Sequence, residues 1–375
     1  MLTALSELSQ MFRAQAEGCR ANGGPTGSPL THALLSAAAD DLDAGGVSAE
    51  VMAGAERDRQ GSVPGLRFAG AVHRLVLEGR APDLARHYPN VGGRLRADEL
   101  WADAEPVLRE HLDELRRRVR ATVVQTNEPG RMAPMLGGLL VAAQRAAREV
   151  GRSGAFPVRL WEIGASGGLN LRPDRVAVRL GNGDVLGDPD SPLRLDAQWT
   201  GLPPADLGQP LQVVERAGCD THPVDVSTED GRLHLSSFVW PDQLDRWRRA
   251  QAAMRLAAED PVLVERASGP DWLSRRLTQR QSGVLTVVWH SVVWQYVPPG
   301  DRARGRSVLA EAAAQATPDA PLALLVYEPR RVPNSEGGPY RFDLLLRLWP
   351  AGLSLHLGSG GGHGIPFTWN EQVWN

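Results

Sequence analysis

The residues best suited to chemistry lie in a short glycine-rich stretch, LWEIGASGGLN, at positions 160–170. An apolar run leads into Gly164, Gly167 and Gly168. Glycines after a buried strand let a ligand approach the main chain, where N–H groups point outward. One class of enzyme uses such a turn to hold a nucleotide-like cofactor, and another uses it to mount a serine nucleophile. A tight turn without any ligand is the third interpretation.

The cofactor interpretation rests on the spacing E-x-G-x-G-x-G, which is typical of enzymes that use S-adenosylmethionine. The glutamate and the outer glycines are present, and a serine replaces the middle glycine. The NAD fingerprint G-x-G-x-x-G does not fit, because its second and third glycines would fall on a serine and a leucine. The predicted cofactor-binding residues of this loop are Glu162, Gly164, Ala165, Ser166 and Gly168.

The same residues fit the G-x-S-x-G elbow of serine hydrolases, with Ser166 as the nucleophile. A histidine near the end of the chain would have to take the proton from the serine, and His363 has the required order. The loop alone therefore leaves both enzyme classes open.

The next predicted strand, QVVERAGCD, favours the cofactor interpretation. Its apolar run stops at Asp220, where a nucleotide-binding sheet places a carboxylate for the ribose hydroxyls. The distance from the glycines is longer than usual, and a Gly-, Pro- and Asp-rich insertion at 171–210 accounts for the excess. The alternative for Asp220 is a solvated aspartate in a turn.

Two further places carry candidate substrate contacts. The strand VLTVVWH ends in His290, which could act as a general base because an unperturbed imidazole titrates near pH 6.5. A buried histidine that binds strand ends is the alternative. The turn QTNEPGR at 125–131 follows a predicted helix and is either a plain connection or a polar lid. The lid would offer Gln125, Asn127, Glu128 and Arg131 to a small polar substrate or to the methionine end of S-adenosylmethionine.

Apolar spacing predicts the elements that position these residues. Residues 1–150 show helical periodicity and contain one tryptophan, Trp101, so we expect an all-helical cap domain there. In 151–375, short apolar strands alternate with helical stretches, which predicts a Rossmann-like parallel sheet. The segments YRFDLLLRLWPAG and LSLHLGSGGGHG predict a terminal antiparallel hairpin. We interpret 171–210 as an inserted loop or small subdomain.

Composition excludes several function classes. The net charge is −3, so no basic field points to nucleic acid. Cys19 and Cys219 are the only cysteines, which leaves no basis for a disulfide framework or a metal cluster. Every basic residue is arginine, which rules out catalysis by a lysine. No signal peptide or membrane span is predicted. We expect a cytoplasmic protein that binds neither membrane nor metal; the oligomeric state stays open.

Several separated segments together resemble a known family. They are VVQTNEPGR, WEIGASGGLNL, AGCDTHPVDV, FVWPDQLDRW and WHSVVWQYVPP. In this order they are similar to the uncharacterised bacterial family DUF2332, over about residues 28–330. The resemblance implies a fold like that of S-adenosylmethionine-dependent methyltransferases behind a helical N-terminal region. At the acid usual after the third strand, this chain has Ala267, and Asp271 follows four residues later.

The sequence therefore predicts a methyltransferase that uses S-adenosylmethionine and acts on a small polar molecule. The catalytic residue would be His290. A degenerate domain that binds a similar ligand without catalysis is the second hypothesis, and a serine hydrolase using Ser166 is the third.

Overall fold

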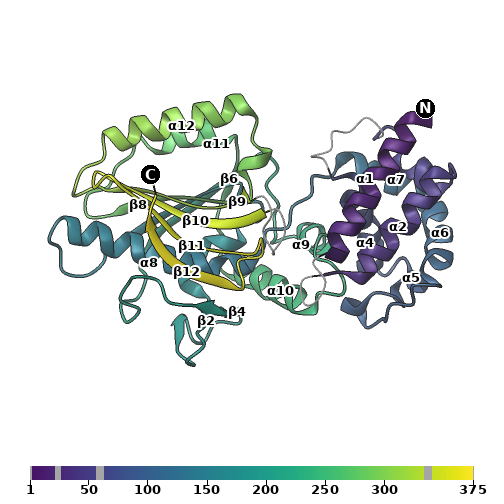
Figure 1. The fold of residues 1–375 in the computed structure, drawn as a ribbon, viewed down its shortest axis with the longest axis horizontal. Coiled ribbons are helices and arrows are strands. Elements are labelled where there is room, and N and C mark those ends of the chain that lie inside the picture. Colours follow the sequence, from purple (N-terminus) through teal and green to yellow (C-terminus); the bar gives the residue numbers. More distant parts are fainter. Residues whose placement is uncertain (1, 22–26, 56–62, 333–339, 375) are drawn as a thin grey trace. The chain divides into compact units, whose positions relative to one another are not determined.

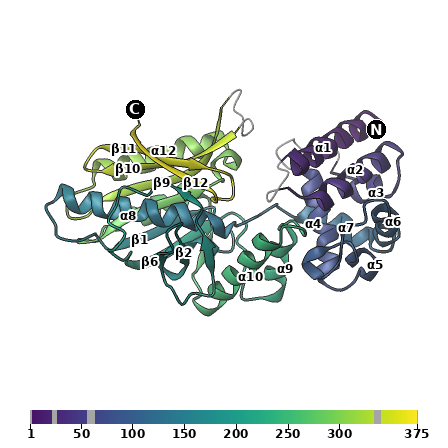
Figure 2. The same ribbon diagram turned by 60° about the horizontal axis from the view of Figure 1, so that its bottom comes forward.

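The computed structural model describes residues 2–21, 27–55, 63–332 and 340–374. Contacts divide the chain into two compact units, each built from two separate segments. Unit 1 comprises residues 1–126 and 225–251, and unit 2 comprises 127–224 and 252–375. Figures 1 and 2 show their elements from two directions.

Unit 1 is helical, as the sequence predicts for the N-terminal region. Its core contains Phe12, Leu34, Phe68 and Leu75, none of which is exposed. Ser28 caps the second helix by accepting a hydrogen bond from the Thr31 amide. The helices are α1 (Leu2–Ala21), α2 (Pro29–Asp43), α3 (Val47–Met52), α4 (Pro64–Leu77), α5 (Pro82–Ala85), η2 (Pro89–Val91), α6 (Leu100–Glu110), α7 (Leu112–Ala121), α9 (Glu229–Ser237) and the first half of α10 (Leu244–Glu259).

Unit 2 is built on a nine-stranded sheet whose order is β5-β12-β11-β10-β9-β8-β1-β6-β7. The five strands from β9 to β7 run parallel, and β10, β11 and β12 add antiparallel pairs. The bounds are β1 (Val158–Ile163), β5 (Trp199–Thr200), β6 (Val213–Asp220), β7 (Val264–Arg266), β8 (Leu285–Ser291), β9 (Leu322–Arg331), β10 (Tyr340–Trp349), β11 (Leu353–Gly360) and β12 (Phe367–Val373). The predicted α/β class and the terminal antiparallel hairpin, β10–β11, are confirmed.

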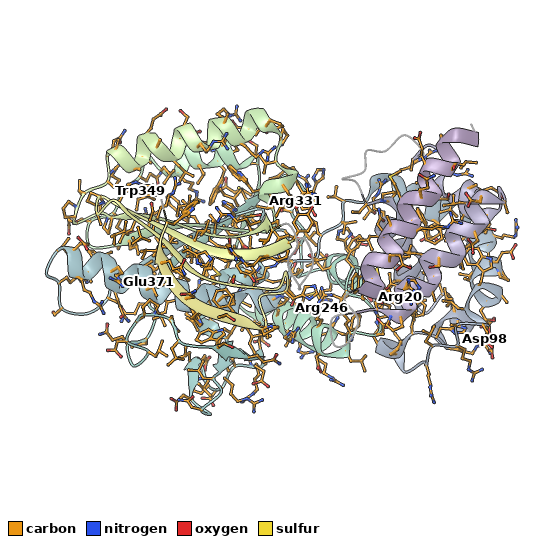
Figure 3. All side chains as sticks on the ribbon, viewed as in Figure 1. Arg20, Asp98, Arg246, Arg331, Trp349 and Glu371 are labelled. Atoms are coloured by element: carbon orange, nitrogen blue, oxygen red, sulfur yellow. The ribbon has the colours of Figure 1, made fainter. Side chains whose placement is uncertain are left out.

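Helices cover both faces of this sheet. On one face lies α8 (Met132–Glu149), where Gly138 contacts Leu325 and Leu344. The other face carries α11 (Gly269–Arg276) and α12 (Pro299–Ala314), which bury Trp161 and Val288. An ion pair also joins α8 to β12, between Arg145 and Glu371, at 2.9 Å (Glu371 is labelled in Figure 3).

The inserted segment 171–210 forms a small sheet of its own, in the order β3-β2-β4. Its strands are β2 (Ala177–Arg179), β3 (Val185–Gly187) and β4 (Arg194–Asp196), after the short helices η4 (Leu169–Leu171) and η5 (Pro173–Arg175). The segment then reaches the main sheet, where β5 pairs with β12.

The units divide at places other than residue 150, where the composition changes. Because α8 packs on β8, β9 and β10, it groups with the sheet, and the division falls between Thr126 and Asn127. Residues 225–251 follow β6 in sequence but group with unit 1, because α9 packs on α4.

Candidate functional site

The glycine turn at the end of β1 has the left-handed backbone that its glycines suggest. Gly164, Ser166 and Gly168 have φ angles of 70°, 54° and 67°. The amides of Gly164 and Ala165 both donate to the carbonyl of Cys219 on β6, at 2.8 and 3.0 Å. These bonds fix the turn at the carboxyl end of two parallel strands, where ligands bind in open α/β sheets.

A protein side chain fills the space that Gly164 leaves open. A Cβ atom at this position would overlap Cγ2 of Val293, in the segment after β8. Glycine is therefore required here by the approach of a neighbouring segment, whether or not a ligand binds close by.

Asp220 closes the same turn from the end of β6. Its Oδ2 accepts from the Ser166 amide at 2.9 Å, and its Oδ1 accepts from the His222 amide at 2.8 Å. The first of these bonds ties the end of β6 to the glycine turn.

Asn127 links the predicted lid turn to the glycine turn. Oδ1 of Asn127 accepts from the amides of Gly167 and Leu169, at 3.2 and 3.1 Å. Glu128 instead caps its own helical turn, η3 (Pro129–Arg131), by accepting from Gly130. Gln125 belongs to unit 1. Substrate binding by these four residues stays a prediction.

Arg131 lies buried under a second glycine-rich segment, between β11 and β12. Its Nε donates to the carbonyl of Gly362 at 3.0 Å, and Nη1 lies 3.4 Å from the Ser291 carbonyl. Gly364, at φ 79°, packs so closely on Arg131 that a Cβ atom would lie 2.6 Å from the arginine Cα. The sequence predicted this segment as part of the terminal hairpin and as the place of His363. Its glycines are explained by this packing.

Glu162 is the most unusual titratable group of the site. Its side chain is almost fully buried, and burial raises the pKa of the carboxyl to about 8. The Trp289 indole and the Arg131 charge act against this increase. Three buried oxygens beside the turn have no hydrogen-bond partner among the described residues: Glu162 Oε2, Ser166 Oγ and Asn170 Oδ1.

His290 is held in one orientation at the end of β8. Its Nδ1 lies 2.7 Å from Oε1 of Glu328, and its ring stacks on Trp294 at 5.1 Å. The same glutamate oxygen accepts from the amides of Val293 and Trp294. A proton on Nδ1 shared with the carboxylate leaves Nε2 as the acceptor, which is the arrangement a general base needs.

His290 and Glu162 lie on opposite faces of the sheet. Glu162 is in register with Trp289, so these two side chains point to one face, and the next residue, His290, points to the other. The structure thus brings both residues to the carboxyl edge of adjacent strands without placing them in contact. Sequence reasoning missed Glu328, although its place at the end of an apolar strand resembles that of Asp220.

Comparison with known proteins identifies the family. A family model described as "Uncharacterized protein conserved in bacteria (DUF2332)" matches residues 9–369. The chain belongs to the DUF2332 family. The resemblance predicted from separated segments is confirmed and extends over nearly the whole chain. No curated protein and no solved structure matches it.

In this DUF2332 chain, the residues after β7 hold a helix end. Ala267 donates its amide to the Asp220 carbonyl at 3.0 Å. Asp271 accepts a 2.6 Å hydrogen bond from the hydroxyl of Ser268, which caps α11, and pairs with Arg304 at 2.8 Å. Asp271 therefore stabilises the start of α11.

The described residues show no pairing of the kind a hydrolase needs at the turn. The Ser166 hydroxyl has no hydrogen-bond partner among them, histidine included. In the same part of the chain, no group of three or more His, Cys, Asp or Glu residues could hold a metal ion. None of the described helices combines the length and apolar character that crossing a bilayer requires.

Proposed function

We propose that unit 2 binds S-adenosylmethionine at the glycine turn and transfers its methyl group to a small polar molecule. The observation that carries the proposal is the pair of unpaired buried oxygens of Glu162 and Asn170. Buried acceptors without donors are costly, so such a set favours a ligand rich in N–H groups. The ammonium group at the amino-acid end of the cofactor has this character.

The strand order supports the proposal. Numbered along the chain, the parallel strands β7-β6-β1-β8-β9 have the order 3-2-1-4-5, which doubly wound nucleotide-binding sheets also show. In such sheets the ligand lies where the order reverses, here between β1 and β8. Glu162 and His290 end these two strands.

The chain's residues fit the cofactor better at its amino-acid end than at its nucleoside end. Glu162 and Asn170 would bind the ammonium group, and Asp220, at the end of β6, would accept from the ribose hydroxyls. Ala267 offers no polar side chain for the adenine. When bound, S-adenosylmethionine supplies an electrophilic methyl group. Glu328 would orient His290 so that its Nε2 accepts the proton of the methyl acceptor.

Titration calorimetry with S-adenosylmethionine and S-adenosylhomocysteine tests the proposal. We expect binding, and a loss of about tenfold or more in Glu162→Gln, the usual effect of removing a hydrogen bond to a charged group. The matched control Glu149→Gln, at an exposed position on α8, should bind like the native protein. At pH 7 binding should release a proton, since a nearby cation lowers the raised pKa of Glu162.

Three other outcomes would decide against methyl transfer. No binding at millimolar cofactor would overturn the proposal. Binding without transfer to any small polar acceptor would favour the degenerate binding domain. Labelling of Ser166 by a fluorophosphonate, lost in Ser166→Ala, would establish the hydrolase. In the cofactor proposal Ser166→Gly keeps its affinity, because it restores the usual glycine.

A further inference from the structure

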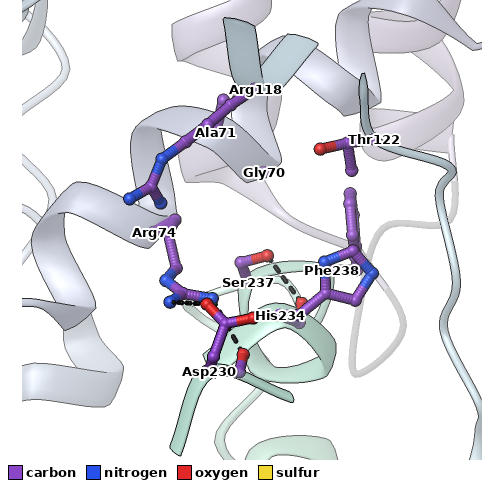
Figure 4. A pocket seen from close by; sticks show the side chains of 9 residues that line it. All are labelled: Gly70, Ala71, Arg74, Arg118, Thr122, Asp230, His234, Ser237 and Phe238. Atoms are coloured by element: carbon purple, nitrogen blue, oxygen red, sulfur yellow. Dashed lines mark hydrogen bonds and ion pairs between the residues drawn. The ribbon is translucent and has the colours of Figure 1, made fainter. Parts of the chain in front are cut away.

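A separate cavity of about 230 Å³ lies inside unit 1, far in sequence from the glycine turn. It is formed by α4, by the end of α7 and by α9 (Figure 4). Its lining includes Ala71, Arg74, Arg118, Thr122, His234 and Phe238.

Two arginines on one side of the cavity are held in place by a carboxylate. Glu78 accepts from Arg74 Nε at 2.6 Å and from Arg118 Nη2 at 2.9 Å. Although burial acts against it, these bonds lower the pKa of Glu78, which stays ionised. Arg118 Nη2 also binds Glu114, whereas its Nε and Nη1 have no partner among the described residues. Arg118 thus reaches the cavity with donors to spare.

The side of the cavity opposite the two arginines carries both polar groups and an apolar surface. Thr122 and His234 project from it in Figure 4, next to Phe238. Burial, together with the charge of Arg74, lowers the pKa of His234, so its ring is neutral at pH 7 and offers one donor and one acceptor. The ring packs edge-on against Phe238 at 5.3 Å. Gly70, Ala71 and Phe238 supply the carbon surface.

The charged side chains around the cavity indicate which class of ligand it suits. Arg74, Arg80 and Arg118 are paired with Glu78, Glu114 and, at the rim, Asp230, so little positive charge is in surplus. The Asp230 side chain is 88% exposed and screened by solvent, whereas those of Arg74 and Arg118 are only 12% and 25% exposed. Such a site suits one negative charge better than the two of a phosphate.

We infer that this cavity binds a small organic monocarboxylate. The carboxylate would accept from Arg118, with Thr122 and His234 as further donors, and the carbon body would pack on Phe238 and Ala71. The volume limits the ligand to a molecule smaller than those that fill pockets of about 300–1,000 Å³. The inference rests on unit 1 alone and does not depend on the function proposed for unit 2.

Calorimetric titration of the full chain with benzoate, and with benzamide as its neutral isostere, tests the inference. We expect benzoate to bind at least tenfold more tightly than benzamide. Arg118→Gln should weaken benzoate binding about tenfold, and the control Arg117→Gln, at the adjacent exposed position, should not change it. Asp230→Asn should strengthen binding, because it removes a carboxylate that competes for Arg74.

Thr122→Val provides a second test should Arg118→Gln fold poorly, since it removes a hydroxyl without changing the shape. It should weaken benzoate binding several-fold. Equal binding of benzoate and benzamide, no binding of benzoate at millimolar concentration, or unchanged affinity in both Arg118→Gln and Thr122→Val would overturn the inference. Glu162→Gln should leave benzoate binding unchanged, which separates this site from the glycine turn.

Discussion

Glu162 is an acid that the fold keeps away from water, and this has a consequence for stability. Burial raises its pKa from 4.5 to about 8, so between these values the folded protein holds a proton that the unfolded chain releases. Stability should therefore fall as the pH rises from about 4.5 to 8. Glu162→Gln, which resembles the protonated form, should gain about 3–4 kcal/mol relative to the native protein between pH 5 and pH 8.

Urea unfolding of both proteins at pH 5 and pH 8 measures this difference. The exposed control Glu149→Gln should follow the pH dependence of the native protein. If Glu162→Gln and the native protein lost the same stability between these pH values, the carboxyl would have to be ionised in the fold, and the interpretation of its burial would be wrong.

At the scale of residues, sequence reasoning found groups whose neighbours in the chain already mark them. Asp220 and Glu162 end apolar runs, and Asn127 lies in a recognisable turn. It did not find Glu328 as the partner of His290, because that pair depends on the alignment of two strands separated by a helix. It also assigned Asp220 to a ligand, and the structure adds the Ser166 amide as a bonding partner.

At the scale of elements, the glycine turn and the segment after β8 depend on each other. Gly164→Ala should destabilise the protein by about 2–3 kcal/mol, because φ is positive and the new methyl group meets Val293. The control Gly151→Ala has a similar φ of 65° and nothing within 4 Å, so it should cost only about 1 kcal/mol.

A double-mutant cycle separates two contributions to the destabilisation: the overlap of the new methyl group with Val293 and the strain of a positive φ at residue 164. In a Val293→Ala background, Gly164→Ala should be less destabilising by about 1 kcal/mol. Denaturant unfolding of the four proteins gives this coupling energy. Additive effects would show that Val293 does not press on the turn.

The predicted strands were those with continuous apolar runs, such as VRLWEI, which is buried at every position. β12 was missed because FTWNEQV buries only Phe367 and Trp369 and is otherwise exposed. The three-residue strands of the 171–210 sheet are too short to show a period. A strand that is buried on both faces has a continuous apolar run in its sequence. A short or partly exposed strand at a sheet edge has no such run.

At the scale of the whole molecule, neither unit is a continuous stretch of chain. The sequence could not show that α9 groups with unit 1, because the amphipathic pattern of a helix does not say which partner it packs on. Its grouping with unit 1 depends on surface that α4 offers: a Cβ atom at Gly70 would lie 2.6 Å from the Phe238 ring, so only glycine admits the phenylalanine.

This grouping predicts how the chain opens. Leu75 is fully buried in α4, and Leu75→Ala should destabilise unit 1 by about 3 kcal/mol through the cavity it leaves. Because α9 packs on α4, the amides of 229–237 should exchange hydrogen faster in this variant. The amides of β6, which immediately precede this region in sequence, should change little, since they are bonded within the sheet of unit 2.

The matched variant Leu346→Ala, fully buried on β10, should have the opposite effect and leave α9 protected. Hydrogen exchange followed by mass spectrometry compares the two. If Leu75→Ala accelerated hydrogen exchange equally in α9 and β6, segments adjacent in sequence would open together. The contacts within each unit argue against this result.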